Sequence, residues 1–347
     1  MTMQTRRFDA TGLPGRRDVN GNAEFVRACF SLLGHGLKLS DPETPNEMRA
    51  LQYRLYHAGR HDVALGRLFE GHVDAMQIIH RYASRSQRQS VEQMIASAPV
   101  LGVWNAEGPD HHLDFDGETL TGGKSYASGA GILSHVLVTS KAGTPDVQLH
   151  LVDLAEFPPN IDRSWWSVAG MQQSQTHQVR WSGAKATQFG MPGDYEREPW
   201  FSGGALRFAT VQAGGLAGLL DAVRAHLSKL GRTNDPVQER RLAEMHMWCS
   251  AAANTVLIAG QSCIDGDETE IAHTVSNARN MVYECCERGI SIAQRACGTA
   301  AYFEDNPVCR FAQDLGMYIR QPGPDAQMAK VGKAVVDGTL DPWPCGF

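Results

Sequence analysis

The spacing of hydrophobic residues changes twice along the 347-residue chain. Apolar residues recur at helical intervals from about Asn22, and again from Trp200 onward. From Pro99 to the start of that second helical stretch, short β-type runs are divided by Gly, Pro and Asp turns. This order predicts an α+β protein in three parts: an N-terminal helical domain (1–98), a middle antiparallel β-barrel (99–199) and a C-terminal four-helix bundle (200–347).

The first part holds several short helical patterns. A Pro-rich stop precedes one helix at Met48–His57, and a short helix is expected at Val91–Ala96 before Pro99. Between them, Asp62 has the position of an N-cap for a helix that extends to about Ile79. His72 on this helix is interpreted as a packing residue.

The middle part is organised around the glycine-rich stretch Leu101–Gly131. Asp116-Gly117 and Gly122-Gly123 are dipeptides that close tight hairpins, and residues 143–146 form another clear turn signal. Trp165, Trp166 and Trp181 are interpreted as packing anchors, any of which could line a pocket. The expected strands are Val100–Trp104, Leu113–Phe115, Thr119–Thr121, Ser125–Ala127, His135–Thr139, Val147–Asp153, Thr176–Trp181 and Ala186–Phe189.

The last part predicts four long helices joined by short links, which is typical of an antiparallel bundle. Glycines in the first of these helices would permit close contacts with its neighbours. The expected helices are Leu206–Leu230, Val237 to about Gly260, Asp267 to Arg288 or beyond, and one that begins at Asn306-Pro307.

Composition narrows the function. The hydrophobic share of 42% and charged share of 20% are ordinary for a soluble globular protein, and a net charge of -6 argues against nucleic-acid binding. The eight cysteines form no CxxC motif and complete no zinc site, so we expect reduced thiols in a cytoplasmic protein without a metal. There is no membrane-length apolar run and no phosphate-binding glycine motif.

Several motifs occur in an order that resembles the acyl-CoA dehydrogenase family of flavoproteins. The resemblance covers most of the chain from about Ala50. It rests on residues 59–79, on the segments LGVWNAEGP and LTGGKSYASGAG, on residues 170–179 followed by Phe189-Gly190, on Arg241–Met245, and on Ala296–Ala300 with Asn306-Pro307 and Asp314 beyond. The order of helices, strands and a helical bundle agrees with it.

The resemblance implies an FAD site between barrel and bundle. Tyr126 and Ser128 match the aromatic and hydroxyl positions that contact the flavin ring in the family, where an aromatic face packs on the ring and a hydroxyl holds a ring nitrogen. The alternative is that Tyr126 and Trp104 belong to the barrel core and Ser128 to a turn. The implied cofactor-binding residues are Trp104, Asn105, Tyr126, Ala127, Ser128, Arg232 and Gly298.

Both family positions for the catalytic base lack a carboxylate. One position falls at Pro322 and the other at about Phe208. Removing an α proton requires a base within reach, and Asp325 is the weak candidate that the sequence offers. Arg207 is a weak candidate for binding the substrate.

The cofactor positions also depart from the family pattern. Residues 108–112 stand where the family has a hydroxyl residue that helps to hold the pyrophosphate. The family's Arg-x-Phe-Gly turn, which reaches the cofactor of a neighbouring subunit, is shortened to residues 231–236. Arg232 keeps the charge that a diphosphate requires.

Three functions follow from the resemblance. The first is an FAD-dependent dehydrogenase that acts on the α and β carbons of an acyl thioester and passes electrons to an acceptor. The second is a non-catalytic subunit of a hetero-oligomer, and the third is a flavin-dependent oxidase or hydroxylase of the same fold. The expected partners are a small-molecule substrate and further subunits of a homodimer or tetramer, with no nucleic acid and no membrane span.

Overall fold

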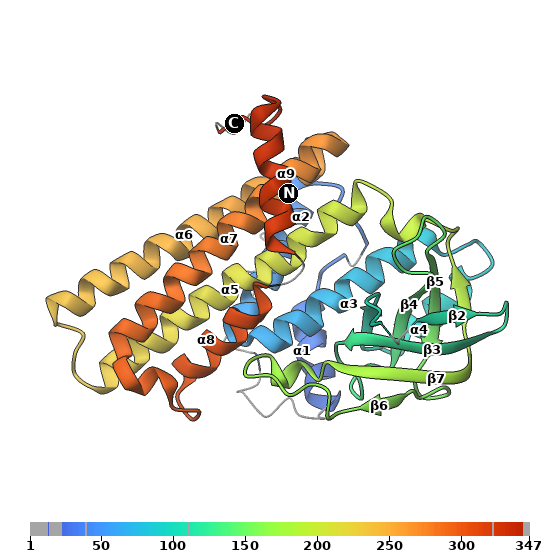
Figure 1. The fold of residues 1–347 in the computed structure, drawn as a ribbon, viewed down its shortest axis with the longest axis horizontal. Coiled ribbons are helices and arrows are strands. Elements are labelled where there is room, and N and C mark those ends of the chain that lie inside the picture. The colour runs from blue at the N-terminus through green and yellow to red at the C-terminus, as the bar shows by residue number, and fades with distance from the viewer. Residues whose placement is uncertain (1–12, 14–22, 39, 110–111, 321–322, 343–347) are drawn as a thin grey trace.

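The computed structural model describes residues 13, 23–38, 40–109, 112–320 and 323–342, and it has helices at both ends of the sequence and strands between them (Figure 1). The helices are α1 (Ala23–Gly34), α2 (Pro45–His61), α3 (Val63–Tyr82), α4 (Arg88–Ala96), α5 (Trp200–Lys229), α6 (Pro236–Asp265), α7 (Glu268–Cys297), α8 (Pro307–Tyr318) and α9 (Pro324–Val336). The strands are β1 (Leu101–Trp104), β2 (Leu113–Phe115), β3 (Thr119–Ala127), β4 (His135–Ser140), β5 (Gln148–Asp153), β6 (Asn160–Asp162), β7 (His177–Lys185) and β8 (Thr187–Phe189). The predicted order of helices, then strands, then a helical bundle is confirmed, whereas the described strands form two sheets and the closed barrel stays a prediction.

The strands form two four-stranded sheets. One sheet has the order β1-β4-β5-β8, and β1 and β4 are its only parallel pair in the described part of the chain. The other sheet, β2-β3-β7-β6, is antiparallel throughout. The end of β1 and the end of β3 both contribute residues to one cavity.

One turn prediction is wrong. Asp116-Gly117 does close the hairpin between β2 and β3, but Gly122 and Gly123 lie inside a continuous strand β3. Gly122 has φ of +116°, and a Cβ atom there would come within 1.9 Å of the His112 carbonyl oxygen. Glycine is therefore needed at this position because β2 approaches closely, and not because the chain reverses.

The predicted N-terminal helices form, although α2 and α4 begin earlier than expected, and α2 and α3 start at capping residues in the sequence. Thr44 caps α2, and the Asp62 carboxylate accepts a hydrogen bond of 3.0 Å from the Leu65 amide at the start of α3. The α3 helix is buried on nearly all sides, since it packs against β1 on one side and α5 on the other. It is therefore the element that joins sheet and bundle.

The long helices α5, α6 and α7 run side by side, with α2 packed against α5 (Figure 1). Glycines permit this close approach: a Cβ atom on Gly214 of α5 would come within 1.9 Å of the Tyr56 carbonyl oxygen of α2. These helices extend further than the sequence predicted; α5, for example, begins at Trp200 and not at Leu206. Of the six earlier residues, all except Gly203 line the cavity described below.

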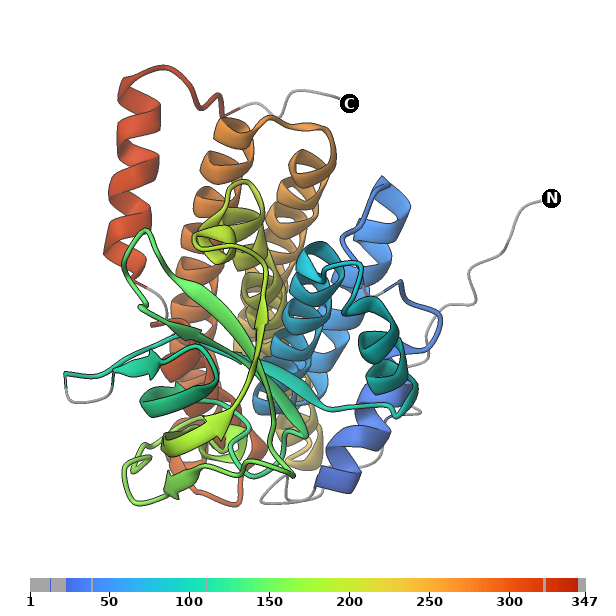
Figure 2. The same ribbon diagram turned by 90° about the vertical axis from the view of Figure 1, so that its right-hand side faces the viewer.

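The α9 helix was not predicted. The sequence indicated a turn around Asp325, but Pro324 begins a helix, because proline suits the first helical turn. Seen after a 90° rotation, α9 and the helices α1–α4 lie on opposite sides of the molecule (Figure 2). Within the described residues, no helix has the length and apolar character that crossing a membrane requires.

Candidate active site

A cavity of about 920 Å³ lies between the sheets and the helices. Its walls come from α3, from the ends of β1 and β3, from the 171–176 segment and from α5, α7, α8 and α9. This volume is near the upper end of the range for ligand sites, about 300 to 1,000 Å³. A smaller cavity of about 110 Å³ adjoins it at Arg81, Trp200 and Arg207.

The strand ends supply an aromatic ring to this cavity. Tyr126 is 47% exposed, has φ of +53°, and lines the cavity together with Trp166. Its ring makes edge-on contacts with Trp165 at 4.9 Å and with Trp166 at 6.2 Å between centroids. The unusual backbone conformation turns the Tyr126 side chain out of the sheet, so that one ring face remains available to a ligand.

A chain of hydroxyl groups ends at Ser128. The Thr176 hydroxyl donates to Ser128 Oγ at 2.9 Å and lies 2.7 Å from Ser174 Oγ, which in turn donates to the Met171 carbonyl. All of these residues line the cavity. Because Ser128 Oγ accepts from Thr176, its own hydrogen remains to be donated toward the cavity.

Asn105 supplies a second donor beside Ser128. Its side-chain oxygen accepts a hydrogen bond of 2.7 Å from Thr139, and its carbonyl accepts one of 3.0 Å from the fully buried Lys124. Lys124 also binds Glu107 at 2.7 Å. Burial lowers the pKa of Lys124, and Glu107 opposes that effect. These contacts fix the end of β1, so that the Asn105 amide nitrogen remains available to a ligand.

The segment that leaves β6 ties the sheets to α8. Met171 has a left-handed conformation, with φ of +59°, and its amide donates to Asp314 Oδ1 at 2.5 Å. At Gly170 a Cβ atom would come within 2.1 Å of the Gln313 carbonyl oxygen. This close contact holds the start of the segment that carries Ser174 and Thr176 against the middle of α8.

The helical walls carry an excess of positive charge. Three carboxylates line the cavity, Glu70, Asp74 and Glu198, against six cations: Arg67, Arg81, Arg207, Arg279, Arg320 and Lys330. The whole chain has a net charge of -6, so the positive cavity is a local feature. Such a lining favours a ligand with phosphate or carboxylate groups.

Most of these charges are paired. Arg207 binds the Asp74 carboxylate and the Gln77 amide oxygen, and Arg320 binds Glu287 and the Tyr283 hydroxyl. Arg279 lies over the Phe208 ring at 4.9 Å from its centroid, and burial lowers the pKa of this arginine to about 10. The helical wall is thus apolar around Phe208 and cationic at its edges.

The structure distributes the predicted cofactor residues over different environments. Asn105, Tyr126 and Ser128 line the cavity together. Ala127 and Trp104 are buried, and the Trp104 indole donates to the Ser128 carbonyl at 2.8 Å. Neither of these two side chains is among those that line the cavity, so each acts behind its wall.

Arg232 and Gly298 lie away from this cavity. Arg232 follows α5 and pairs with Asp235 at 2.7 Å. Gly298 ends α7 with φ of +59°. The assignment of Arg232 to a cofactor depended on a second subunit, and the assignments of both residues stay predictions.

The residues predicted for substrate binding and for proton removal also lie in different environments. Arg207 lines the cavity, but its charge is engaged by Asp74. Phe208 lines the cavity as an apolar residue, and Pro322 lies outside the described residues. Asp325 is exposed on the first turn of α9 and does not line the cavity, although its neighbours Ala326 and Gln327 do.

Sequence reasoning missed Glu70. This residue lies on α3, is 7% exposed, and contributes a carboxylate to the cavity. The available signal was its position within an otherwise apolar helix, three residues after Arg67 and four before Asp74, which places all three on one helical face. The hydroxyl chain through Ser174 and Thr176 was missed as well, since those residues read as ordinary loop and strand positions.

Several solved structures have the same architecture as this chain. The FMN-bound TdsC from Paenibacillus sp. A11-2, a dibenzothiophene monooxygenase, is 17% identical with a TM-score of 0.76, covering 95% of this chain and 99% of that chain. A glutaryl-coenzyme A dehydrogenase in complex with glutaryl-CoA is 17% identical with a TM-score of 0.76, covering 92% and 89%. KijD3 with FMN and a dTDP-sugar is 17% identical with a TM-score of 0.73, covering 93% and 89%.

This chain therefore has the fold of the acyl-CoA dehydrogenases, and the resemblance seen in the sequence is confirmed at the level of the fold. No protein-family model matches the sequence, and comparison with curated proteins gives no significant match. The same fold serves a monooxygenase and a dehydrogenase, so the reaction has to be argued from the site.

Proposed function

We propose that this protein is a flavin-dependent oxidoreductase that binds its flavin in the cavity beside Tyr126 and Ser128. The observation that carries the proposal is the set of groups at the strand ends: an exposed aromatic ring, a hydroxyl with a hydrogen to donate and an amide nitrogen from Asn105. A flat heterocycle with several ring nitrogens and carbonyl oxygens needs such partners. When bound, a flavin would supply a two-electron acceptor.

The residues present fit such a group. The cavity of about 920 Å³ has room for a ring system and a substrate, and Phe208, Val275 and Met317 give it an apolar wall on the helical side. The cations at its edge, among them Arg279 and Lys330, are suited to a phosphate. Tyr126 and Ser128 would hold and orient the ring, while the aromatic residues Trp166 and Phe208 exclude water.

The sequence resemblance predicts FAD, whereas the TdsC and KijD3 structures contain FMN. The two cofactors share the ring and the first phosphate, and FAD adds a second phosphate and an adenosine. We propose FAD, with FMN as the direct competitor in the binding test. Arg232 and Gly298 would contact the FAD of a neighbouring subunit.

For the reaction, we propose dehydrogenation of an acyl thioester at its α and β carbons. An apolar wall and a cationic edge suit a substrate with a hydrocarbon end and a phosphorylated end. The alternative is an oxidase or hydroxylase, which the apolar Phe208 at a family base position favours. A non-catalytic subunit is the third possibility, and it rests on the vacant base positions.

The first experiment is cofactor binding. The purified chain is examined by visible absorption, then incubated with FAD or FMN and separated from free cofactor. We expect a retained flavin spectrum and tighter binding of FAD than of FMN. Ser128→Ala removes one hydrogen bond and should weaken binding about tenfold. Tyr302→Ala, which changes an exposed aromatic residue outside the cavity, is the matched control.

Flavin uptake decides the proposal, and two activity assays then separate the three possible functions. A chain that is colourless and takes up neither flavin overturns it. If flavin binds, reduction by a series of acyl-CoA thioesters under anaerobic conditions tests the dehydrogenase, and oxygen uptake with an added reductant tests the oxidase or hydroxylase. A flavin-loaded protein that is inert in both assays supports the non-catalytic subunit.

A further inference from the structure

One face of α3 is turned toward the cavity. The α3 residues that line the cavity recur at spacings of three, four and seven, which place side chains on one side of a helix. They are Arg67, Glu70, Gly71, Asp74, Ile78 and Arg81. Gly71 keeps this face open, because a Cβ atom there would come within 3.0 Å of the Arg67 guanidinium. Two carboxylates and two guanidinium groups therefore lie along one wall.

Glu70 differs from the other carboxylates of the cavity. Glu198 uses both oxygens, accepting from the Ser202 amide at 2.9 Å and the Ser202 hydroxyl at 2.6 Å. Asp74 is bound by Arg207, and its side chain is 25% exposed. Glu70 is more than nine-tenths buried, and its Oε2 atom accepts no hydrogen bond from the described part of the chain.

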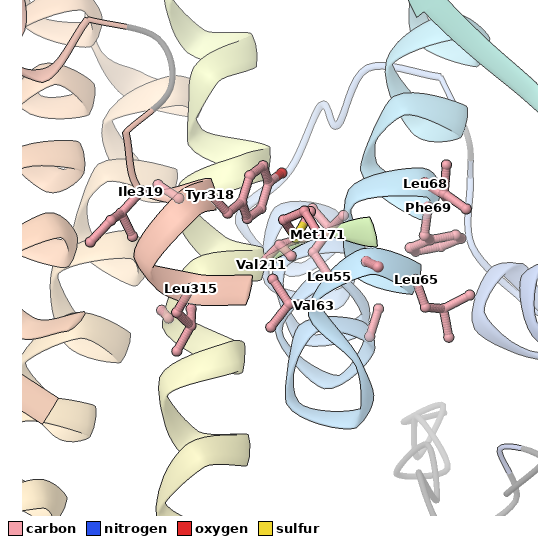
Figure 3. Packing of buried hydrophobic residues seen from close by; sticks show 14 of the residues in the cluster. Leu55, Val63, Leu65, Leu68, Phe69, Met171, Val211, Leu315, Tyr318 and Ile319 are labelled. Carbon is pink, nitrogen blue, oxygen red and sulfur yellow. The ribbon is translucent and has the colours of Figure 1, made fainter. Parts of the chain in front are cut away.

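The other oxygen of Glu70 is held in place. Arg67 donates to Oε1 at 2.5 Å, and the Tyr318 hydroxyl donates to the same atom at 3.3 Å. Tyr318 is the last residue of α8 and belongs to the same buried cluster as Met171 and Leu315 (Figure 3). These contacts hold Oε1, and Oε2 is the oxygen of this cavity-lining residue that is left to accept a proton.

The surroundings of Glu70 shift the pKa of its carboxyl in opposite directions. Burial raises the pKa of the Glu70 carboxyl, and Asp74 on the next turn of α3 raises it further. Arg67 on α3, Arg207 on α5 and the Tyr318 hydroxyl on α8 lower it. The net direction is upward, which moves the carboxyl toward the range in which a group accepts and returns protons near neutral pH.

We propose that Glu70 is the proton acceptor of this cavity, with Arg67 and Tyr318 as positioning residues. The inference rests on the proposed function, since the oxidant is the bound flavin. Glu70 Oε2 forms a bond to an acidic proton on the carbon next to a thioester carbonyl, and that C–H bond breaks. The electron pair of that C–H bond becomes the double bond between the α and β carbons as the hydrogen on the β carbon leaves with its own electron pair, for which a bound flavin would be the two-electron acceptor.

Position supports this assignment over the other candidates. Tyr318, which donates to Glu70, is the last residue of α8, and both residues line the cavity. Phe208, at the other position, has no group to accept a proton. Asp325 is exposed on α9 and does not line the cavity.

The test separates proton removal from turnover. Flavin-loaded protein is titrated with acetoacetyl-CoA, whose acidic α protons allow an enolate to form without oxidation, and an enolate stacked on oxidised flavin absorbs at long wavelength. The variants are Glu70→Gln, Glu70→Asp and Tyr318→Phe, with Asp325→Asn as the matched carboxylate-to-amide control. Flavin affinity is measured for each variant as a check on folding.

We expect Glu70→Gln to bind flavin and lose the long-wavelength band, and Asp325→Asn to keep both. Glu70→Asp retains the acid on a side chain one methylene shorter, so its band should be weaker. The Tyr318→Phe band should appear at higher pH, because a donor to the ionised carboxylate is gone. If Glu70→Gln fails to fold, the other two variants still decide the proposal.

The contrary results are distinct. Wild-type protein that takes up no flavin overturns the proposed function and this inference together. Flavin uptake with a band that survives Glu70→Gln, or that is lost only in Asp325→Asn, overturns the role of Glu70 alone. Flavin uptake with no band in the wild type, or a Tyr318→Phe band with an unchanged pH dependence, also counts against it.

Discussion

His72 couples the stability of the fold to pH. It lies on α3, is 7% exposed, and packs against Phe30 with ring centroids 5.0 Å apart. Its Nδ1 atom accepts a hydrogen bond of 3.2 Å from the Leu101 amide at the start of β1. The interpretation of His72 as a packing residue is thus confirmed, and protonation would break its contact between α3 and the sheet.

The size of the effect follows from the pKa. Burial lowers the pKa of His72 from 6.5 to about 4, so the folded state binds fewer protons than the unfolded state between these values. The contribution to stability is therefore complete above pH 6.5 and is lost as the pH falls toward 4. Each pH unit in this interval removes about 1.4 kcal/mol, which gives a total loss of about 3 kcal/mol.

The assay compares the wild type with His72→Gln, whose amide oxygen can still accept from Leu101 but does not titrate in this range. Urea unfolding is followed by tryptophan fluorescence at several pH values from about 7.5 to about 4, within the interval set by linkage. We expect the wild type to lose about 3 kcal/mol more than His72→Gln over this interval. Parallel stability curves for the two proteins would refute the reasoning.

Three further results are expected. Gly214→Ala should lower the melting temperature strongly, because its Cβ atom would overlap a carbonyl oxygen of α2, whereas Gly332→Ala on the open face of α9 should raise stability by up to about 1 kcal/mol. Gly122→Ala should also destabilise the protein, by roughly 2 kcal/mol or more, since its φ is positive and β2 is too close; an unchanged melting temperature would contradict this account. Tyr318→Phe should leave flavin affinity intact and raise the pKa of the Glu70 carboxyl, which carboxyl infrared titration of the variant and wild type would measure.

The sequence by itself determined the caps, turns and helix starts that depend on a few consecutive residues. The Asp62 cap, the Asp116-Gly117 hairpin and the proline starts of α6 and α8 are each set by a few consecutive positions. The motif order also indicated the fold, because the lengths of helices and strands limit how the parts can pack. The domain boundaries at residues 98 and 199 stay a prediction.

Long-range packing decided what the sequence misjudged. The Gly122-Gly123 pair resembles a turn until β2 and β7 are seen on either side of it. Trp104 resembles a ligand contact by position, but its indole bonds to the Ser128 carbonyl and it stands behind the cavity wall. In both cases the outcome depends on residues that are distant in sequence.

The candidate site likewise contains residues that the sequence indicated and one that only the structure revealed. The resemblance of the sequence to the acyl-CoA dehydrogenases indicated Tyr126, Ser128 and Asn105, and all three line the cavity. It did not identify Glu70, since one carboxylate in an apolar helix is ambiguous until its neighbours are known. Only the tertiary structure brings α8 and its Tyr318 hydroxyl to Glu70, because burial and hydrogen bonding arise from contacts across the fold and not from order along the chain.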